Sequence, residues 1–382
     1  MRRRLLVPFA LALLVGVAAV LGTSTATRAS SGSTAANIAA AKAFVAKSMK
    51  SPKWAGPTAK VDTAKAKGKS VYFVNLTEAI PALHEWSVVL AQQLKAAGVN
   101  TTSCDPKGTA NGITSCLTQA LAAKPDAIVA LALDNDFIAS YMEKAKAAGI
   151  AFITAQSGRP ELPTAPAGRV AEVTFDYYQV GRILGAWFAA DSNCAKGAPQ
   201  IVTTTSSRQP SAAEVAGMQS AIKQYCPGMK IPGPQNVLIP DWPTKLPVVT
   251  RSTLLANSKL KYILPLYDGM TIYMNPSIKQ VHRSDVRMGS FNATPVVMQT
   301  EVAKRSPLVA DVGGPNQWFA VGLADQVLRV LAGQAPVKSE NIPLRLFTQA
   351  NIKSIDVSKD EATWYGSVNP ICQYHTLWGI AC

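Results

Sequence analysis

The apolar residues of this chain fall into short runs that are separated by longer amphipathic stretches. Residues 71–76 (VYFVNL) form a β-branched and aromatic run, and an amphipathic pattern typical of a helix follows over residues 82–97. Residues 127–133 (AIVALAL) are almost wholly apolar. Strands that read as continuous apolar runs, alternating with helices, indicate a parallel sheet that is covered on both faces.

The same alternation continues almost to the end of the chain. Further strands are expected at a segment ending at residue 104 and at residues 151–154, 170–175, 200–204, 237–239, 261–264, 286–290, 308–312 and 344–348. Helices are expected over residues 112–123, 177–190 and 317–331, and in segments ending at residues 148, 225 and 256. Two such series predict an α/β fold with two doubly wound parallel-sheet lobes. Ligands bind beyond the carboxyl ends of the strands in such sheets, so the residues after each strand are candidate site residues.

The first residues have the pattern of an export signal. Three arginines at positions 2–4 precede an apolar stretch over residues 5–21 and a small, polar stretch after it. This order predicts a secretory signal peptide over residues 1–29, with an uncleaved membrane anchor as the alternative. The protein is therefore expected in the periplasm, the cell envelope or the extracellular space. Residues 30–68 are expected to form a helix and a linker rich in Pro, Lys, Ala and Gly.

Length and charge narrow the function further. About 350 residues follow the signal peptide. A domain with a single hydrophobic core is usually smaller than this, so two lobes are favoured. The net charge of +15 comes from scattered single Lys and Arg residues, so it indicates surface charge and no nucleic-acid partner.

Six cysteines in an exported chain indicate disulfides. Six cysteines allow fifteen pairings, and proximity in sequence favours Cys104–Cys116, Cys194–Cys226 and Cys372–Cys382. None of these spacings is a zinc pattern, so neither a metal nor another cofactor is expected.

Several short motifs, taken with the order of elements, resemble those of a known family. They are Lys124-Pro125-Asp126, Ala147-Ala148-Gly149-Ile150, Phe175-Asp176, Tyr267-Asp268-Gly269-Met270 and Gly289-Ser290-Phe291-Asn292. Over roughly residues 70–350 the chain resembles the type 1 periplasmic binding proteins, the group that binds ribose and galactose.

The resemblance implies two lobes joined by three hinge strands. Lobe 1 would comprise residues 69–173 plus 314–342 and lobe 2 residues 176–312 plus 343–360, followed by a disulfide-closed tail, 361–382. It also implies a monomer that closes over a small-molecule ligand and presents it to an ABC permease in the membrane.

The candidate ligand positions depart from the sugar binders of this group, which hold hydroxyl groups with Asp, Asn and Arg. Matching strand ends puts Leu131 where they have Asn, and Gln156 where they have Asp. Tyr267 falls on an Asn and Asn292 on an Asp, and their Arg falls near Glu214. Because a buried hydroxyl group without a partner costs roughly 1–3 kcal/mol, these losses indicate a ligand less polar than a simple aldose, such as an aromatic compound, a terpenoid or steroid fragment, or a modified sugar.

The residues expected to contact the ligand come from both lobes. They are Ile80, Leu83, Trp86, Leu131, Asp134, Gln156, Arg208, Trp242, Tyr267, Phe291, Asn292 and Gln317. Trp242, Phe291 and Tyr267 would form apolar walls, while Gln156, Asn292 and Asp134 would orient the ligand. For other polar residues a structural role is favoured: helix capping for Asp136, Asp268 and Asn316. Arg208 would meet an anionic group of the ligand or form a salt bridge across the lobe.

The sequence thus favours an exported solute-binding protein of an ABC importer. A simple-sugar or polyol binder of the same class and a receptor for a membrane sensor remain as alternatives. An exported enzyme is the least favoured, because His84, His282 and His375 lie far apart in sequence and no G-x-S-x-G, Walker or H-E-x-x-H motif accompanies them.

Overall fold

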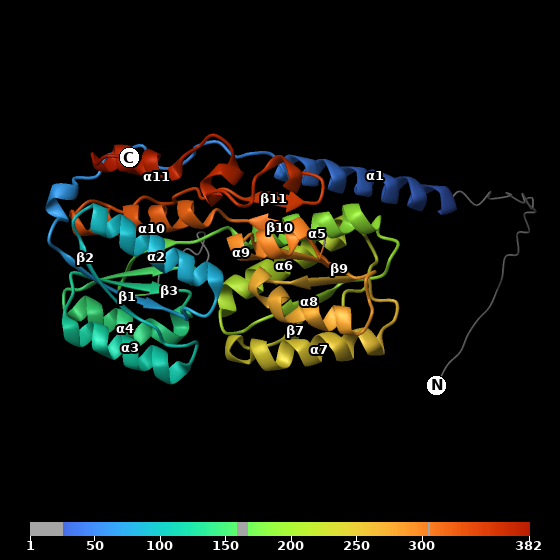
Figure 1. The fold of residues 1–382 in the computed structure, drawn as a ribbon, viewed down its shortest axis with the longest axis horizontal. Helices are drawn as coiled ribbons and strands as arrows, with labels where there is room; N and C mark the ends of the chain where they lie inside the picture. Colours follow the sequence, from blue (N-terminus) through green and yellow to red (C-terminus); the bar gives the residue numbers. More distant parts are fainter. Residues whose placement is uncertain (1–25, 159–166, 305) are drawn as a thin grey trace, which may run out of the picture.

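A computed structural model describes residues 26–158, 167–304 and 306–382 of the chain. These residues form two α/β lobes that lie side by side, each a sheet with helices on both faces (Figure 1). The fold class expected from the pattern of apolar runs is confirmed.

The first lobe contains a five-stranded parallel sheet in the order β2-β1-β3-β4-β5. Its strands are β1 (Ser70–Asn75), β2 (Asn100–Cys104), β3 (Ala127–Leu131), β4 (Ala151–Ala155) and β5 (Arg169–Val173). Its helices are α2 (Pro81–Ala96), α3 (Ala110–Ala123), α4 (Asn135–Ala147) and α10 (Asn316–Leu331). Strand β3 is central and buried along its whole length, which explains why it reads as a continuous apolar run.

The second lobe contains a six-stranded sheet in the order β11-β10-β9-β8-β6-β7. Its strands are β6 (Gln200–Thr203), β7 (Gln235–Asn236), β8 (Tyr262–Pro265), β9 (Arg287–Asn292), β10 (Leu308–Gly313) and β11 (Arg345–Thr348). Its helices are α5 (Tyr177–Ser192), α6 (Arg208–Tyr225), α7 (Trp242–Ala256), α8 (Thr271–Gln280) and α9 (Pro295–Thr300). Strand β11 runs antiparallel to β10 at the edge of an otherwise parallel sheet.

Two local expectations are wrong, and proline accounts for both. The strand expected over residues 237–239 is β7, two residues earlier, and Ile239–Asp241 is a 3-10 helix that contains Pro240. Proline fixes φ and has no N–H for a strand ladder, so it favours the helical turn here. Helix α9 was not expected; it begins with a proline and has only six residues, which makes its pattern hard to recognise.

The polypeptide crosses between the two lobes at residues 174–176, 314–315 and 332–344. These crossings join β5 to α5, β10 to α10, and α10 to β11, and they correspond to the three hinge segments that the resemblance implied. They bring the carboxyl ends of both sheets to the space between the lobes.

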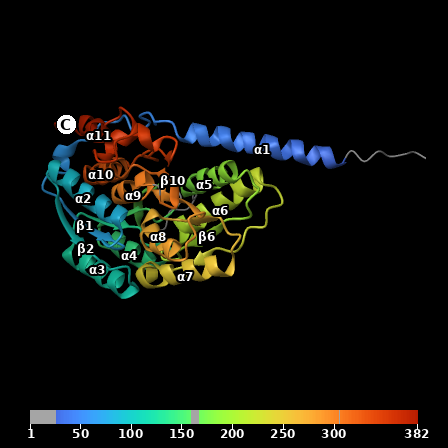
Figure 2. The ribbon, with the colours of Figure 1, turned by 45° about the vertical axis from the view of Figure 1, so that its right-hand side comes forward.

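The two ends of the described chain also connect the lobes. Helix α1 (Ala26–Ser48) packs on α5 and α6 of the second lobe and projects beyond it (Figures 1 and 2). The segment that follows reaches the first lobe, where the Trp54 ring stacks on Trp318 with 5.3 Å between ring centroids. At the other end, α11 (Pro370–Trp378) packs on α10, where the sequence suggested only a loop closed by a disulfide.

Disulfides join the three pairs that sequence proximity favoured: Cys104–Cys116, Cys194–Cys226 and Cys372–Cys382. They tie β2 to α3, the end of α5 to the end of α6, and α11 to the last residue of the chain. The apolar stretch of the expected signal peptide lies outside the described residues. Within the described residues, no helix is long and apolar enough to cross a membrane.

Candidate binding cavity between the lobes

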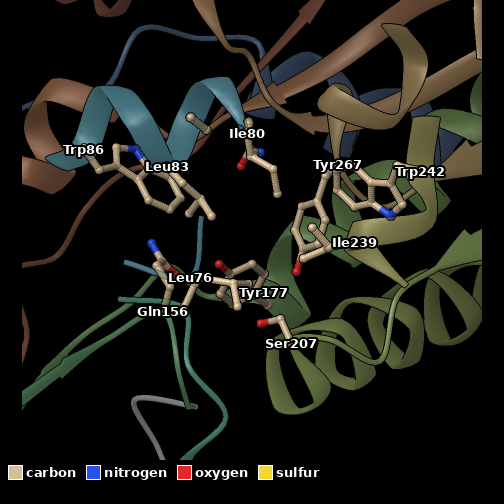
Figure 3. A pocket seen from close by; sticks show the side chains of 13 residues that line it. Leu76, Ile80, Leu83, Trp86, Gln156, Tyr177, Ser207, Ile239, Trp242 and Tyr267 are labelled. Carbon is tan, nitrogen blue, oxygen red and sulfur yellow. The ribbon is translucent and has the colours of Figure 1, made fainter. Parts of the chain in front are cut away.

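A pocket of about 390 Å³, part of which is open to solvent, lies between the lobes. Side chains from both lobes surround it (Figure 3). The first lobe contributes Leu76, Ile80, Ala82, Leu83, Trp86, Ala132 and Gln156, and the second contributes Tyr177, Ser207, Ile239, Trp242, Tyr267 and Asn292. Four of these residues end a strand or come directly after one, namely Leu76, Ala132, Gln156 and Asn292, so the cavity occupies the position where doubly wound sheets bind ligands.

The lobes touch one another around this cavity. Arg208 of the second lobe lies 3.6 Å from a carboxylate oxygen of Asp134 and 3.6 Å from one of Asp136, both in the first lobe. On another side, Gly108 of the first lobe lies close to the Pro240 ring of the second lobe; a Cβ atom built on Gly108 would be 3.5 Å from that ring. These contacts join the two lobes directly.

The lining of the cavity is rich in aromatic rings and carries no charge. Trp86, Tyr177, Trp242 and Tyr267 contribute rings, and among the described residues no Lys, Arg, His, Asp or Glu lines the cavity. The indole N–H groups are already bonded within the protein: Trp86 Nε1 donates to Asn316 Oδ1 over 2.7 Å, and Trp242 Nε1 donates to the Val237 carbonyl over 3.1 Å. These bonds fix the two indole rings in place.

Two buried polar side chains of the lining are incompletely bonded. Gln156 Oε1 accepts from the Phe175 amide (3.3 Å) and from Thr174 Oγ1 (3.2 Å), which leaves Gln156 Nε2 without a partner in the described part of the chain. Asn292 Oδ1 likewise has no partner there. An unsatisfied buried polar group costs about 1–3 kcal/mol. A ligand that accepts from Gln156 and donates to Asn292 would remove both costs.

Three residues of the lining hold unusual backbone angles. Ala132, Gln156 and Asn292 have φ of 58°, 54° and 128°, although none of them is glycine. They stand where β3, β4 and β9 end. Positive φ is unfavourable for residues with a side chain, and such residues gather at binding sites where the fold holds them in place. The strained positions therefore coincide with the cavity.

Several carboxyl groups are buried in the second lobe, and Glu214 lies close to the two tyrosines of the cavity. Glu214 and Asp311 are fully buried, and neither oxygen of the Glu214 carboxyl group has a hydrogen-bond partner within the described residues. Burial raises the pKa of both carboxyl groups well above its usual value. Burial also raises the pKa of Asp268 to about 7, although the Thr294 amide and hydroxyl groups donate to its carboxylate over 2.6 and 2.9 Å.

The hydroxyl groups of the cavity tyrosines face this acidic region. The Tyr267 hydroxyl lies 3.4 Å from Ser211 Oγ, on the same helix as Glu214. Burial, followed by the neighbouring carboxyl of Glu214, raises the pKa of Tyr267, and the pKa of Tyr177 is raised by burial with smaller contributions from Tyr267 and Glu214. Both tyrosines are therefore neutral hydrogen-bonding groups.

Seven residues expected at the site from the sequence lie on the lining. They are Ile80, Leu83, Trp86, Gln156, Trp242, Tyr267 and Asn292. Leu131 and Phe291 do not: both are fully buried inside the lobes, and the next residue in each case, Ala132 or Asn292, lines the cavity. Successive side chains of a strand point to opposite sides, so an offset of one residue accounts for both differences. The Phe291 ring packs edge-on against Phe175 instead.

Asp134, Arg208 and Gln317 are also absent from the lining. The Asp134 carboxylate caps α4 by accepting from the Asp136 amide over 3.0 Å, so the cap expected at Asp136 falls two residues earlier. Arg208 forms the salt bridge that was its alternative role, directed across to the other lobe. The backbone N–H of Gln317 donates to the Glu361 carboxylate over 3.0 Å at the start of α10.

Two other expected caps are wrong. The Asp268 side chain accepts from Thr294 and does not cap its own helix. Pro315 is the N-cap residue of α10, and the Asn316 side chain connects Trp86 to Glu361.

The sequence reasoning missed six lining residues: Leu76, Ala82, Ala132, Tyr177, Ser207 and Ile239. Leu76 and Ala132 each come directly after a strand, so considering the first residue after every strand end would have identified them. Ile239 was assigned to a strand that ends earlier. In the described part of the chain, no group of His, Cys, Asp and Glu side chains is placed to hold a metal ion.

Comparison with known proteins gives one family match. The model of the periplasmic binding protein domain matches residues 71–328, which is more than half of the chain and includes every residue that lines the cavity. None of the curated proteins matches the chain.

Several solved structures share the fold. A 5-methylthioribose transporter solute-binding protein from Thermotoga lettingae superposes with a TM-score of 0.71 at 16% identity, covering 83% of this chain and 100% of that one. A solute-binding protein from Agrobacterium vitis with bound allitol gives 0.68 at 20% identity, covering 76% of this chain and 98% of that one. One from Mycobacterium smegmatis with bound glycerol gives 0.67 at 17% identity, with coverage of 77% and 98%. At these identities the likeness shows the shared fold.

Proposed function

Because this chain belongs to the periplasmic binding protein family, we propose that it captures a small organic ligand outside the cytoplasm and delivers it to an ABC permease. The ligand would occupy the cavity between the lobes, and closure of the lobes would be the signal that the permease reads. Members of the family act in transport, and no catalytic role is proposed for this chain.

The observation that carries this proposal is the uncharged, ring-rich lining of the cavity. An aldose brings several hydroxyl groups into the closed site, and each one left without a partner costs about 1–3 kcal/mol. Apart from the two tyrosine hydroxyls, the lining offers Gln156, Ser207 and Asn292 as polar side chains. This supply supports a ligand less polar than a simple aldose: an aromatic compound, a terpenoid or steroid fragment, or a modified sugar.

A simple sugar or polyol is the second candidate, and the similar structures favour it. The proteins from Agrobacterium vitis and Mycobacterium smegmatis were solved with allitol and glycerol. The protein from Thermotoga lettingae holds 5-methylthioribose, a sugar with an apolar thioether group, which lies chemically between the two candidate classes.

A thermal-shift screen of the protein tests the proposal. One panel contains ribose, allitol, glycerol and other sugars and polyols, and the second contains aromatic compounds, terpenoids, steroid fragments and 5-methylthioribose. A ligand at 100 times its dissociation constant stabilises the folded state by about 2.7 kcal/mol. Stabilisation by the second panel alone is the expected result. A hit confined to unmodified sugars or polyols would refute the lower polarity, and no hit in either panel would count against a solute-binding role.

A further inference from the structure

The end of the chain lies outside the part that matches the family domain, residues 71–328. After β11, the C-terminal segment (residues 349–382) first packs on the second lobe. There it forms a 3-10 helix, Glu361–Tyr365, and two rings of this helix pack edge-on against Phe347 of β11, with 6.5 and 5.5 Å between ring centroids. Glu361 is only 3% exposed, so this anchored helix carries a buried carboxyl group.

The Glu361 carboxyl group is bonded to the start of α10 in the first lobe. Its Oε1 accepts from the backbone N–H of Asn316 over 2.8 Å and from the Asn316 side-chain amide over 3.0 Å. Its Oε2 accepts from the backbone N–H of Gln317 over 3.0 Å. The two backbone groups belong to the N–H groups that a helix leaves unbonded in its first turn. A side chain anchored on the second lobe therefore holds a helix of the first.

Asn316 passes this restraint on to the cavity. Its side-chain oxygen accepts from the Trp86 indole N–H over 2.7 Å, while its side-chain nitrogen donates to Glu361. Asn316 is fully buried, and Trp86 lines the cavity from the first lobe (Figure 3). Because both ends of the Asn316 amide are bonded, its orientation is fixed. Glu361, Asn316 and Trp86 thus form a relay of hydrogen bonds from the C-terminal segment to the cavity wall.

Two other contacts surround the Trp86 ring without holding its N–H group. The ring lies against Phe175 and Phe319, with 5.9 and 4.6 Å between ring centroids. Aromatic pairs occur in several orientations. The bond to Asn316 is therefore what sets the direction of the indole N–H.

The relay uses the carboxyl oxygens of Glu361 as acceptors and does not depend on their charge. Burial, followed by the neighbouring carboxyl group of Glu85, raises the pKa of Glu361 well above its usual value. The three N–H groups need acceptor oxygens, which a neutral carboxyl group offers as a carboxylate does. The bonds therefore form in either protonation state.

We propose that Glu361 is a positioning residue of the binding cavity, which acts through Asn316 to fix the indole ring of Trp86. This inference rests on the proposed function and adds to its site a residue that does not line the cavity. Without the Glu361 oxygens, the Asn316 amide is free to turn and no longer fixes the indole N–H. A ligand must then order the Trp86 ring as it binds, which lowers the affinity by roughly 2- to 12-fold.

The first measurement needs no ligand. The indole N–H of Trp86 is followed in ¹H–¹⁵N NMR spectra of the ligand-free protein, and its peak is assigned by its loss in Trp86→Phe. In Glu361→Ala this peak should shift, and its hydrogen exchange with water should become several-fold faster. Glu361→Gln keeps one acceptor oxygen for Asn316, so its peak should lie closer to that of the wild type.

The second measurement is a double-mutant cycle in affinity. The probe is the compound from the two panels above that stabilises the wild type most, titrated by calorimetry. Glu361→Ala should weaken its binding by roughly 2- to 12-fold, and by less in the Trp86→Phe background, where the relay has no N–H to hold. Glu301→Ala is the matched control: Glu301 is also buried and accepts from Thr271 Oγ1 over 2.6 Å, but it does not line the cavity. Thermal unfolding confirms that each variant is folded.

The results separate this inference from the proposed function. An unchanged Trp86 peak in a folded Glu361→Ala protein would overturn the relay, and so would an equal loss of affinity with and without the indole N–H. An equal loss in Glu301→Ala would show that affinity follows stability alone. In each of these cases binding of the probe by the wild type leaves the solute-binding role intact. Failure of every panel compound would count against that role, while the NMR measurement would still decide whether Glu361 positions Trp86.

Discussion

Trp242 offers the sharpest test of the cavity, because its ring forms one wall of the cavity and is almost fully buried. The side chain is 2% exposed, its ring centroid lies 6.4 Å from that of Tyr267, and its N–H is bonded to the Val237 carbonyl. Truncation to alanine should therefore destabilise the fold by about 3–5 kcal/mol. It should also remove about 1–3 kcal/mol of contact with the ligand, a loss of roughly 5- to 150-fold in affinity.

The Trp242→Phe variant separates the ring from the hydrogen bond. It keeps an aromatic wall and loses the bond to Val237, so it should be about 1–2 kcal/mol less stable than the wild type and bind within a few-fold of it. Phe347→Ala is the control for stability, since Phe347 is fully buried in β11 and is absent from the cavity lining. It should lower the melting temperature and leave the affinity unchanged.

Calorimetric titration and thermal unfolding of the three variants measure both quantities. A folded Trp242→Ala protein that binds the ligand as tightly as the wild type would refute the assignment of the cavity. A loss of affinity of the same size in Phe347→Ala would show that affinity merely follows global stability.

Three further predictions concern the lobes and their connections. Arg208→Ala breaks the ion pairs that join the two lobes. Because Arg208 is largely exposed, the loss should be about 1 kcal/mol at most, seen as ligand release up to about fivefold faster in stopped-flow traces. An unchanged release rate would contradict this prediction. The pKa of Asp268 is raised to about 7, chiefly by burial. Between about pH 4 and pH 7 the unfolded state therefore binds fewer protons than the folded state. The free energy of unfolding should fall as pH rises through this window, by up to about 4 kcal/mol for this group. Melting temperatures at pH 5 and 8 check this, and Asp268→Asn should reduce the difference between them; a protein more stable at pH 8 would refute it. Trp54→Ala removes the stacking on Trp318 and should lower the free energy of unfolding by about 1–3 kcal/mol. Hydrogen exchange of the backbone amides should become faster over residues 49–68. Unchanged exchange would show that the Trp54 ring does not anchor this segment.

The fold could be predicted well from the sequence, because a buried parallel strand is recognisable from its own run of apolar residues. Strand β3 is apolar throughout since both of its faces are covered. Asp176 stands directly before the helical pattern of α5, and its carboxylate caps that helix by accepting from the Gln179 amide over 2.9 Å. Both features depend on neighbouring residues alone.

The site was harder to predict, because it depends on where each strand ends to within one residue. Leu131 was expected at the cavity, whereas the next residue, Ala132, lines it. Ala132 has a positive φ that no local sequence pattern predicts. Contacts between distant segments left no local signal either. The pairing of Arg208 with Asp134 and the position of Glu214 behind Tyr267 arise from packing of the two lobes and of helices on the sheet.

The most direct test of the account is a calorimetric titration of the wild-type protein with the most stabilising compound from the two screening panels. The account predicts one binding site per chain, a compound with an apolar body, and an affinity that falls at least about fivefold in Trp242→Ala. An unmodified sugar or polyol as the tightest ligand, bound equally well by the wild type and by a folded Trp242→Ala variant, would contradict it.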